Sequence, residues 1–364
     1  MEIAKQLSAY SGKRVFVTGH TGFKGSWLVA ILNKLGARVM GYALAPNTSP
    51  NHFDLTQSAI ESIIGDIRDS AKLKAAVQGF APDIILHLAA QPLVRYSYQH
   101  PVETYETNVI GTLHLYEAAR ATPSVRAIVS ITTDKVYKNK EWQWGYRENE
   151  ELGGYDPYSA SKACVEIMTS SYRNSFFNLN DYGTKHQVLL ATVRAGNVIG
   201  GGDWSLDRLI PDIVKSSAEG KDTFIRNPAA VRPWQHVVEP VVGYLLVGVR
   251  LLNGEQAYAD AFNFGPNADA NVAVKTIAEI ARRHWAAIAI TLNDGTQGDA
   301  PHEANLLFLD NTKAKKMLGW KPLWNLETTI AHTIDWYRSY YTQGAVLTEA
   351  QIETYLQLIS QAVC

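Results

Sequence analysis

The feature that most constrains the fold is an alternation between Arg14 and Gly196. Short apolar, β-branched runs such as RVFVTG, DIILHLAA and VLLATVRAG are separated by stretches with helical periodicity, such as GSWLVAILNKLG and YSASKACVEIMTSSYRNSF. Apolar strands that alternate with helices of this length are typical of a parallel sheet covered by helices on both faces. The pattern predicts an α/β fold with a Rossmann-type, doubly wound parallel sheet.

The alternation loosens after about Asn197, and this change suggests two domains. The second half contains GGGDWSLDRLIPDIV, a loop-like NPAAVRPWQHVVEP and helical stretches toward the end of the chain. We expect residues 1–196 to form the sheet domain. Residues 197–364 should form mainly a smaller mixed α/β domain, with some segments returning to the first sheet. The two parts should pack together with a cleft between them.

Composition excludes several classes of function. The formal net charge of the 364 residues is −1, so nothing favours nucleic acid or an anionic membrane as a partner. No apolar run reaches the roughly 20 residues of a membrane helix, and the start of the chain lacks a signal-peptide core. The two cysteines, Cys164 and Cys364, are far apart, which argues against a metal site or a disulfide framework. These features fit a cytoplasmic protein.

A glycine-rich turn follows the first apolar run. Gly19, Gly22 and Gly25 in TGHTGFKG have Gly-x-x-Gly-x-x-Gly spacing where the first helix should begin. Glycines at such a point allow a tight turn and let backbone N–H groups approach a pyrophosphate at the helix N-terminus. The strand–turn–helix context favours a dinucleotide site over glycines that only pack the helix on the strand.

The end of the second strand leaves the type of dinucleotide open. A ribose-binding acidic residue usually stands there, but VMGYALAPNTSPN contains no Asp, Glu or Arg. This position therefore does not distinguish NAD from NADP. Asn47, Thr48 or Ser49 could bind a ribose instead. Asp66, after the third apolar run, either meets the adenine edge or caps a helix.

Tyr158 and Lys162, in YSASK, lie four residues apart on one face of a predicted helix. A lysine one turn away, together with a cationic nicotinamide, would lower the pKa of the phenol toward neutrality. Tyr158 could then deprotonate a substrate hydroxyl while a hydride leaves for the cofactor. The pair alone occurs often by chance, but its combination with the glycine turn and with Thr133 at a strand end is specific.

With these motifs the chain resembles the extended short-chain dehydrogenase/reductase family, whose members are largely NAD-dependent nucleotide-sugar epimerases and dehydratases. The strings TGHTGFKG, HLAAQ, NVIGT, TTDKVY, YSASK, RAGNVIG, RPWQHV and KMLGWKP carry the resemblance over nearly the whole chain. It implies NAD as cofactor, held mainly by residues 1–196, and a nucleotide sugar held mainly by residues 197–364. It also implies that Thr133, Tyr158 and Lys162 act together. The cofactor-binding candidates are Gly19, His20, Gly22, Phe23, Gly25, Asp66, Ile67, Leu88, Ala89, Ala90, Asn108, Tyr158 and Lys162.

The residues after Thr133 distinguish the reactions of the family. Dehydratases of dTDP- or GDP-sugars carry Thr-Asp-Glu at this point and epimerases usually lack the acidic pair, whereas this chain reads Thr133-Asp134-Lys135. With GGGDW and RPWQHVVEP, this resembles the dehydratases that act on CDP-glucose. The resemblance implies that a neutral Lys135 removes the carbon 5 proton and a protonated Asp134 donates to the departing 6-hydroxyl. The alternative is a solvated Asp–Lys ion pair at a strand end.

Groups for the substrate are expected along the cleft, because two phosphates need cationic or N–H partners. The resemblance implies that Asn197 and Arg232 lie near the diphosphate. Arg208 either joins them or is an exposed helix residue, and Arg194 is equally compatible with pairing a carboxylate where its strand ends. Two residues of PHEA fall where relatives contact the nucleotide. The full set of substrate candidates is Gln91, Arg95, Ser97, Asn197, Arg208, Arg232, His302 and Glu303.

The expected reaction converts CDP-glucose to CDP-4-dehydro-6-deoxyglucose and water, within deoxysugar and O-antigen synthesis. A nucleotide-sugar 4-epimerase or a net reductase of the same family is the enzymatic alternative. A non-enzymatic dinucleotide sensor or scaffold would typically lose the Tyr158–Lys162 pair. Relatives associate through the helices that carry Asn108 and Tyr158, so the resemblance implies a homo-oligomer, either dimer or tetramer.

Overall fold

The structure is a computed structural model that describes residues 3–206, 208–267, 270–293 and 306–361. Within these residues, seven parallel strands form one sheet in the order β10-β6-β5-β4-β1-β2-β3. From β1 the chain adds β2 and β3 on one side, and it then adds β4, β5, β6 and β10 on the other side of β1. This confirms the predicted doubly wound sheet, with its reversal point between β1 and β4, where ligands bind in such folds.

The strands of this sheet are apolar on both faces. Val15 and Val17 belong to one buried apolar cluster, whereas Phe16 between them belongs to another, as the two-residue period of a strand requires. Sheets buried on both sides need continuous apolar runs, and these runs were the signal in the sequence. The strands are β1 (Arg14–Thr18), β2 (Arg38–Ala43), β3 (Glu61–Ile64), β4 (Ile84–His87), β5 (Ala127–Ile131), β6 (Leu189–Ala195) and β10 (Ala261–Phe264).

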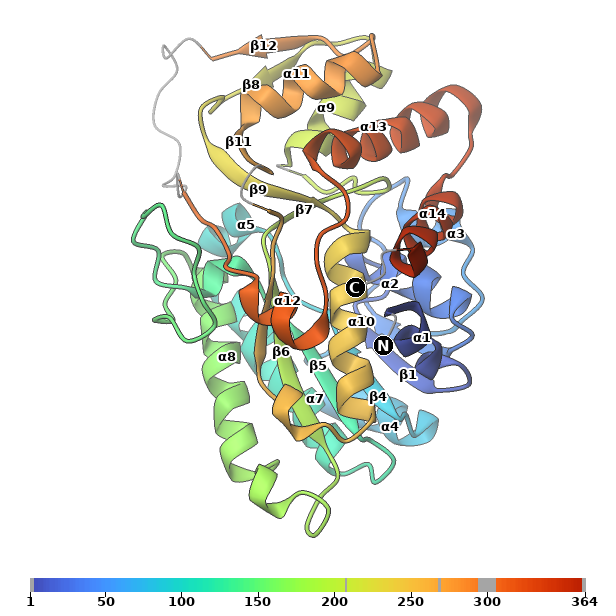
Figure 1. The fold of residues 1–364 in the computed structure, drawn as a ribbon, viewed down its shortest axis with the longest axis vertical. Coiled ribbons are helices and arrows are strands. Elements are labelled where there is room, and N and C mark those ends of the chain that lie inside the picture. The colour runs from blue at the N-terminus through green and yellow to red at the C-terminus, as the bar shows by residue number, and fades with distance from the viewer. Residues whose placement is uncertain (1–2, 207, 268–269, 294–305, 362–364) are drawn as a thin grey trace.

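Helices cover both faces of the sheet (Figure 1). The face that carries Val15 is covered by α1 (Ile3–Leu7), α2 (Phe23–Lys34) and α10 (Val238–Leu252). The opposite face is covered by α4 (Ser70–Phe80), α7 (Gly111–Arg120) and α8 (Pro157–Ser175). Almost every residue of α10 is buried, because this helix lies between the sheet and the C-terminal part of the chain.

A smaller lobe lies above the carboxyl ends of the strands in Figure 1. Its described part contains a sheet of β7 (Asn197–Ile199), β9 (Val231–His236) and β11 (Asn271–Ala273), and a parallel pair of β8 (Thr223–Ile225) and β12 (Ile290–Leu292). Its helices are α9 (Leu209–Ala218), α11 (Val274–His284) and α13 (Leu326–Gln343). The chain enters this lobe where β6 ends and β7 begins, and returns to the large sheet through β10.

The remaining helical segments connect these elements or close the surface. Helix α14 (Thr348–Gln361) packs against α1 and α2, and α12 (Thr312–Leu318) packs near β10. No helix in the described ranges is long and apolar enough to cross a membrane. The other segments are α3 (His52–Thr56), α5 (Val94–Gln99), α6 (Pro101–Tyr105), the π-helical turn η2 (Glu106–Ile110), and the 3₁₀ turns η1 (Ser8–Tyr10), η3 (Asp134–Val136), η4 (Leu179–Asp181) and η5 (Gln256–Tyr258).

Candidate active site

A cavity of about 1440 Å³ runs along the carboxyl ends of the strands, with walls from both lobes. The glycine turn after β1 and the segments that follow β2, β3, β4 and β5 form one wall. Residues from 195–206, 208–212 and 223–234 contribute the other. Every parallel strand ends at this edge, so the fold brings together short sequence motifs that lie far apart along the chain.

The glycine turn presents the N-terminus of α2 to the cavity. Gly19 has a φ of +76°, and a Cβ atom on it would lie 2.7 Å from the Ala89 nitrogen. A Cβ atom on Gly25 would lie 2.1 Å from the Gly19 carbonyl oxygen. Gly22 is the N-cap of α2, and the sequence of the first turn contains no acidic residue. The unpaired N–H groups of this helix end therefore suit an anion such as a diphosphate.

Most of the cofactor candidates line the cavity: Gly19, Gly22, Phe23, Gly25, Asp66, Ile67, Leu88, Ala89, Ala90, Tyr158 and Lys162. His20 and Asn108 lie behind its wall. The His20 ring packs beneath the turn, where Nε2 is 2.7 Å from Ser62 Oγ, and burial lowers its pKa to about 4. This ring supports the turn rather than reaching a ligand.

Asn108 lies in the π-helical turn and is fully buried. Its Oδ1 accepts a hydrogen bond from the Gln91 nitrogen at 2.8 Å, and its Nδ2 donates to Ser161 Oγ at 2.8 Å. These two bonds tie the segment after β4 to helix α8, which carries Tyr158. π-Helical turns inside α-helices occur frequently at functional sites.

Asp66 lines the cavity after the edge strand β3 and is paired within the protein. It accepts hydrogen bonds from the Arg68 backbone nitrogen at 2.8 Å and from Arg68 Nη2 at 2.6 Å, and these bonds lower its pKa. The N-cap of α4 is Asp69, so the capping alternative for Asp66 is wrong. Asn47 and Thr48 lie on the same cavity wall, as the ribose alternatives require.

The chain leaves β5 through the turn that contains Thr133, Asp134 and Lys135. Thr133 Oγ1 donates to Asp134 Oδ1 at 2.9 Å, and Lys135 Nζ lies 3.9 Å from the same oxygen. The Asp134 side chain is only 2% exposed, and its Oδ2 has no hydrogen-bond partner among the described residues. All three side chains line the cavity together with Tyr158. The carboxylate of this pair is therefore buried, whereas the Lys135 side chain is 32% exposed.

Helix α8 begins at Asp156, whose Oδ1 accepts from the Ser159 nitrogen, and it places Tyr158 and Lys162 toward the sheet. Lys162 Nζ donates to the Ile131 carbonyl oxygen at 3.3 Å. Burial raises the pKa of Tyr158 to about 12, although a hydrogen bond with Thr133 acts in the opposite direction. In the protein alone, loss of water around the phenolate outweighs the nearby donors. The expected shift toward neutrality, which also requires a cationic nicotinamide, stays a prediction.

Two of the expected sugar contacts are engaged within the protein. The Gln91 amide donates to Thr104 Oγ1 at 2.9 Å. Ser97 is fully buried behind the cavity wall, and its Oγ accepts from the Tyr158 backbone nitrogen at 3.2 Å. Ser97 therefore holds the start of α8 and does not reach the cavity. The sequence correctly located this segment but could not show which way its side chains turn.

The substrate candidates from the second half converge on the cavity. Asn197, Arg232 and Arg208 line it with Arg95. Arg208 Nη1 donates to Asp203 Oδ2 at 2.9 Å, which raises the pKa of the guanidinium and holds it at the cavity wall, where the side chain is 36% exposed. The last two candidates, His302 and Glu303, lie outside the described residues.

The sequence profile of the family described as GDP-mannose 4,6 dehydratase matches residues 16–333. The chain belongs to this family. It is 50% identical over 333 residues to a CDP-glucose 4,6-dehydratase of Salmonella typhimurium, covering 91% of this chain and 92% of that protein. It is 27% identical over 343 residues to a dTDP-glucose 4,6-dehydratase of Xanthomonas campestris, covering 88% and 92%.

Solved structures of related dehydratases share the fold. The dTDP-glucose 4,6-dehydratase of Streptomyces venezuelae, solved with NAD bound, superposes with a TM-score of 0.75 and 24% sequence identity, covering 91% of this chain and 98% of that one. This likeness agrees with the doubly wound sheet and with the two-lobed arrangement in Figure 1.

This member of the GDP-mannose 4,6 dehydratase family has two charged cavity residues that the sequence interpretation missed. Lys24 is the second residue of α2, and its pKa falls to about 8 because of burial and the nearby charge of Arg208. The second missed residue is Asp203, whose Oδ2 accepts a hydrogen bond from Arg208 Nη1. A lysine in the first turn of a helix opposes the helix dipole, so the position of Lys24 inside the glycine turn was a usable signal. No group of residues able to hold a metal occurs in the described ranges.

Proposed function

We propose that the protein is a redox-neutral lyase that converts CDP-D-glucose to CDP-4-dehydro-6-deoxy-D-glucose and water, using bound NAD. The observation that carries this proposal is the Thr133-Asp134-Lys135 turn, which shares one cavity with Tyr158. The 50% identity to a CDP-glucose 4,6-dehydratase supports the choice of nucleotide. Such an activity would supply deoxysugars for O-antigen in the cytoplasm.

The cavity residues fit a dinucleotide. The N-terminus of α2 would hold the diphosphate, Asp66 and Ile67 the adenosine end, and the segment 88–90 with Lys162 the nicotinamide end. When bound, NAD would accept a hydride from carbon 4 of the sugar and return it to carbon 6. Residues 1–196 would thus hold mainly the cofactor and residues 197–364 mainly the nucleotide sugar.

The proton transfers would be carried out by the side chains of the catalytic turn and of α8. Tyr158, as phenolate, takes the proton of the 4-hydroxyl, and the positive charge of an oxidised nicotinamide would lower its pKa against the effect of burial. Neutral Lys135 takes the proton from carbon 5, which the 4-ketone makes acidic. Asp134 donates a proton to the 6-hydroxyl, the carbon 6–oxygen bond breaks and water leaves.

The same groups would close the proton balance. Lys135 returns its proton to carbon 5. Tyr158 has then gained one proton and Asp134 has lost one, so the protein would return to its starting state when one proton passes from Tyr158 to Asp134. The unpartnered Oδ2 of buried Asp134 is the atom best placed to donate. At the other end of the sugar, Arg208 and Arg232 would neutralise the diphosphate of CDP-glucose.

We also propose a homo-oligomer formed through residues 101–120 and helix α8. These helices pack on each other and present apolar side chains to solvent, among them Val102 at 67% exposure and Ile167 at 58%. Tyr105 and Ile110 add to this face. Exposed apolar patches of this kind commonly mark association sites.

Mass spectrometry of reactions with CDP-, dTDP-, GDP- and UDP-glucose, each with NAD or NADP, tests the proposal. We expect a product lighter by one water, formed fastest from CDP-glucose with NAD and without net consumption of cofactor. A product of unchanged mass would indicate a 4-epimerase, and stoichiometric consumption of NADPH would indicate a reductase. Either result would overturn the proposed reaction.

A further inference from the structure

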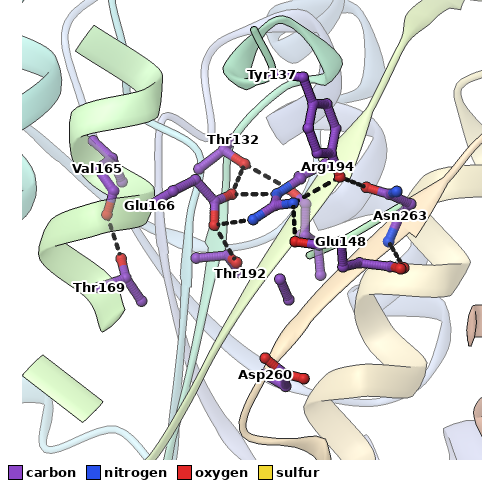
Figure 2. Close-up of polar contacts among 12 residues, drawn as sticks. Thr132, Tyr137, Glu148, Val165, Glu166, Thr169, Thr192, Arg194, Asp260 and Asn263 are labelled. Atoms are coloured by element: carbon purple, nitrogen blue, oxygen red, sulfur yellow. Dashed lines mark hydrogen bonds and ion pairs between the residues drawn. The ribbon is translucent and has the colours of Figure 1, made fainter. Parts of the chain in front are cut away.

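A buried polar network surrounds an ion pair between Glu166 on α8 and Arg194 on β6 (Figure 2). The two Glu166 oxygens accept from Arg194 Nε at 2.9 Å and from Arg194 Nη2 at 2.7 Å. They also accept from Thr132 Oγ1 at 2.5 Å and Thr192 Oγ1 at 2.8 Å. The two charged side chains are 2–3% exposed, and the ion pair lowers the pKa of Glu166, which keeps it ionised.

The network continues through the hydroxyl group of Tyr137. Arg194 Nη1 donates to this oxygen at 2.6 Å, and the hydroxyl donates to Asn263 Oδ1 at 2.8 Å. Asn263, on β10, in turn donates to the Tyr146 carbonyl oxygen at 2.8 Å. One chain of hydrogen bonds therefore joins α8, β6 and β10, the strand contributed by the second half of the sequence (Figure 2).

The two ends of this network bracket the catalytic turn. Thr132 directly precedes Thr133, and Tyr137 stands two residues after Lys135. Within the turn, Thr133 Oγ1 donates to Asp134 Oδ1 and accepts a long bond of 3.4 Å from the Lys135 nitrogen, and Lys135 Nζ lies 3.9 Å from Asp134 Oδ1. Thr133 also forms a hydrogen bond with Tyr158. Backbone bonds at residues 132 and 136 also hold the ends. The directions of the two reactive side chains therefore depend on how these ends are anchored.

A buried ion pair is a costly way to gain stability. Moving both charges out of water offsets much of their attraction, and apolar replacements of similar volume are often neutral or stabilising. Glu166 also lies one helical turn after Lys162 on the same face of α8. The network therefore connects the helix of the Tyr–Lys pair to the turn of the acid and base.

We propose that the Glu166–Arg194–Tyr137 network positions Asp134 and Lys135, and that its Tyr137 end governs the loss of water more than the hydride transfer. This inference rests on the proposed dehydratase function. The larger effect on water loss than on hydride transfer is expected because Tyr158 and the start of α8 have anchors of their own. Tyr158 is held by the Asp156 cap, by Ser97, through Asn108 and by a hydrogen bond with Thr133, and none of these contacts involves Tyr137.

The test is Tyr137→Phe, which removes one hydroxyl and keeps the ring that stacks on Tyr146. Arg194→Lys, which keeps the charge but loses the forked donor, is a second variant. The matched control is Tyr10→Phe, since Tyr10 is also fully buried and its hydroxyl donates to the Leu245 carbonyl oxygen away from the cavity. Single-turnover absorbance of reduced nicotinamide reports the first step, and mass spectrometry reports water loss. Calorimetric titration with NAD reports the affinity for the cofactor, and the melting temperature reports the stability of each variant.

We expect Tyr137→Phe to lose at least about tenfold in the rate of water loss, because small misplacements of reacting groups are costly. Its first step and its affinity for NAD should change less than twofold, so that reduced nicotinamide accumulates. Tyr10→Phe should leave both steps unchanged. An unchanged rate of water loss in Tyr137→Phe, or an equal fall in both steps that follows the melting temperature, would overturn the positioning role. If the wild-type protein removes no water from any nucleotide sugar, the proposed function fails and this inference fails with it.

Discussion

The substitution Gly25→Ala tests whether the glycine turn is built around a dinucleotide. A Cβ atom on residue 25 would lie 2.1 Å from the Gly19 carbonyl oxygen and 2.8 Å from the His20 Cα atom, where ordinary contact begins at 3.4 Å. These atoms belong to the backbone, so a change of side-chain rotamer cannot relieve the clash. Helix α2 and the turn must separate by more than about 1 Å, because interiors are close-packed.

This separation should lower the free energy of unfolding only slightly and should weaken the binding of NAD strongly. Overpacking costs about 1–3 kcal/mol, and the gain of about 0.5–1 kcal/mol from replacing a helical glycine partly offsets it. Loss of N–H bonds to a charged diphosphate costs about 1.5–3 kcal/mol per bond. We therefore expect the Kd for NAD to rise roughly 10- to 100-fold.

Gly79→Ala is the matched control. Gly79 also lies in a helix, α4, but a Cβ atom there would meet nothing within 4 Å. We expect this variant to be stabilised by about 0.5–1 kcal/mol and to bind NAD normally. Calorimetric titration with NAD and urea unfolding measure both quantities. If Gly25→Ala bound NAD as tightly as Gly79→Ala, the tight turn would have no part in holding the cofactor.

Three further predictions concern charge and association. Lys135→Ala should still reduce the cofactor in a single turnover but should fail to release water, and unchanged dehydration would refute its role as base. Lys24→Met should raise the pKa of Lys162, now held near 8 partly by Lys24, so the alkaline limb of the kcat/KM profile should move to higher pH. If the alkaline limb of the profile stayed at the same pH, the charge of Lys24 would have no influence on the activity through Lys162. Val102→Lys and Ile167→Lys should weaken self-association in sedimentation experiments, whereas a wild-type sedimentation profile would place the interface elsewhere.

Local patterns in the sequence were sufficient to predict the sheet and most of the residues that line the cavity. The continuous apolar runs of strands such as β1 and the glycines at the start of α2 are local features of the chain. For the same reason the Tyr158–Lys162 spacing fixed a shared helix face. Thr133 could be assigned to the cavity because it ends a parallel strand, and all such strands end at one edge.

The remaining side chains depend on contacts between segments far apart in the chain. His20 turns under the glycine turn because Gly41 on β2 leaves room for its ring. Ser97 turns inward because the first turn of α8 offers it a backbone donor. Arg194 belongs to a carboxylate on a different element, which matches the structural alternative that the sequence left open. Each of these choices required the packed structure.

The raised pKa of Tyr158 in the protein alone has a consequence for the order of the reaction. At neutral pH a phenol with a pKa of about 12 stays protonated in the protein alone. The positive charge of Arg208 favours the phenolate but offsets only part of the effect of burial. A cationic nicotinamide beside the ring would supply the rest, because an opposite charge within a few ångströms favours the phenolate. Proton removal from the sugar would then begin only when the oxidised cofactor is in place. Tyr158 would therefore act as a base only in the state of the site that can also accept a hydride.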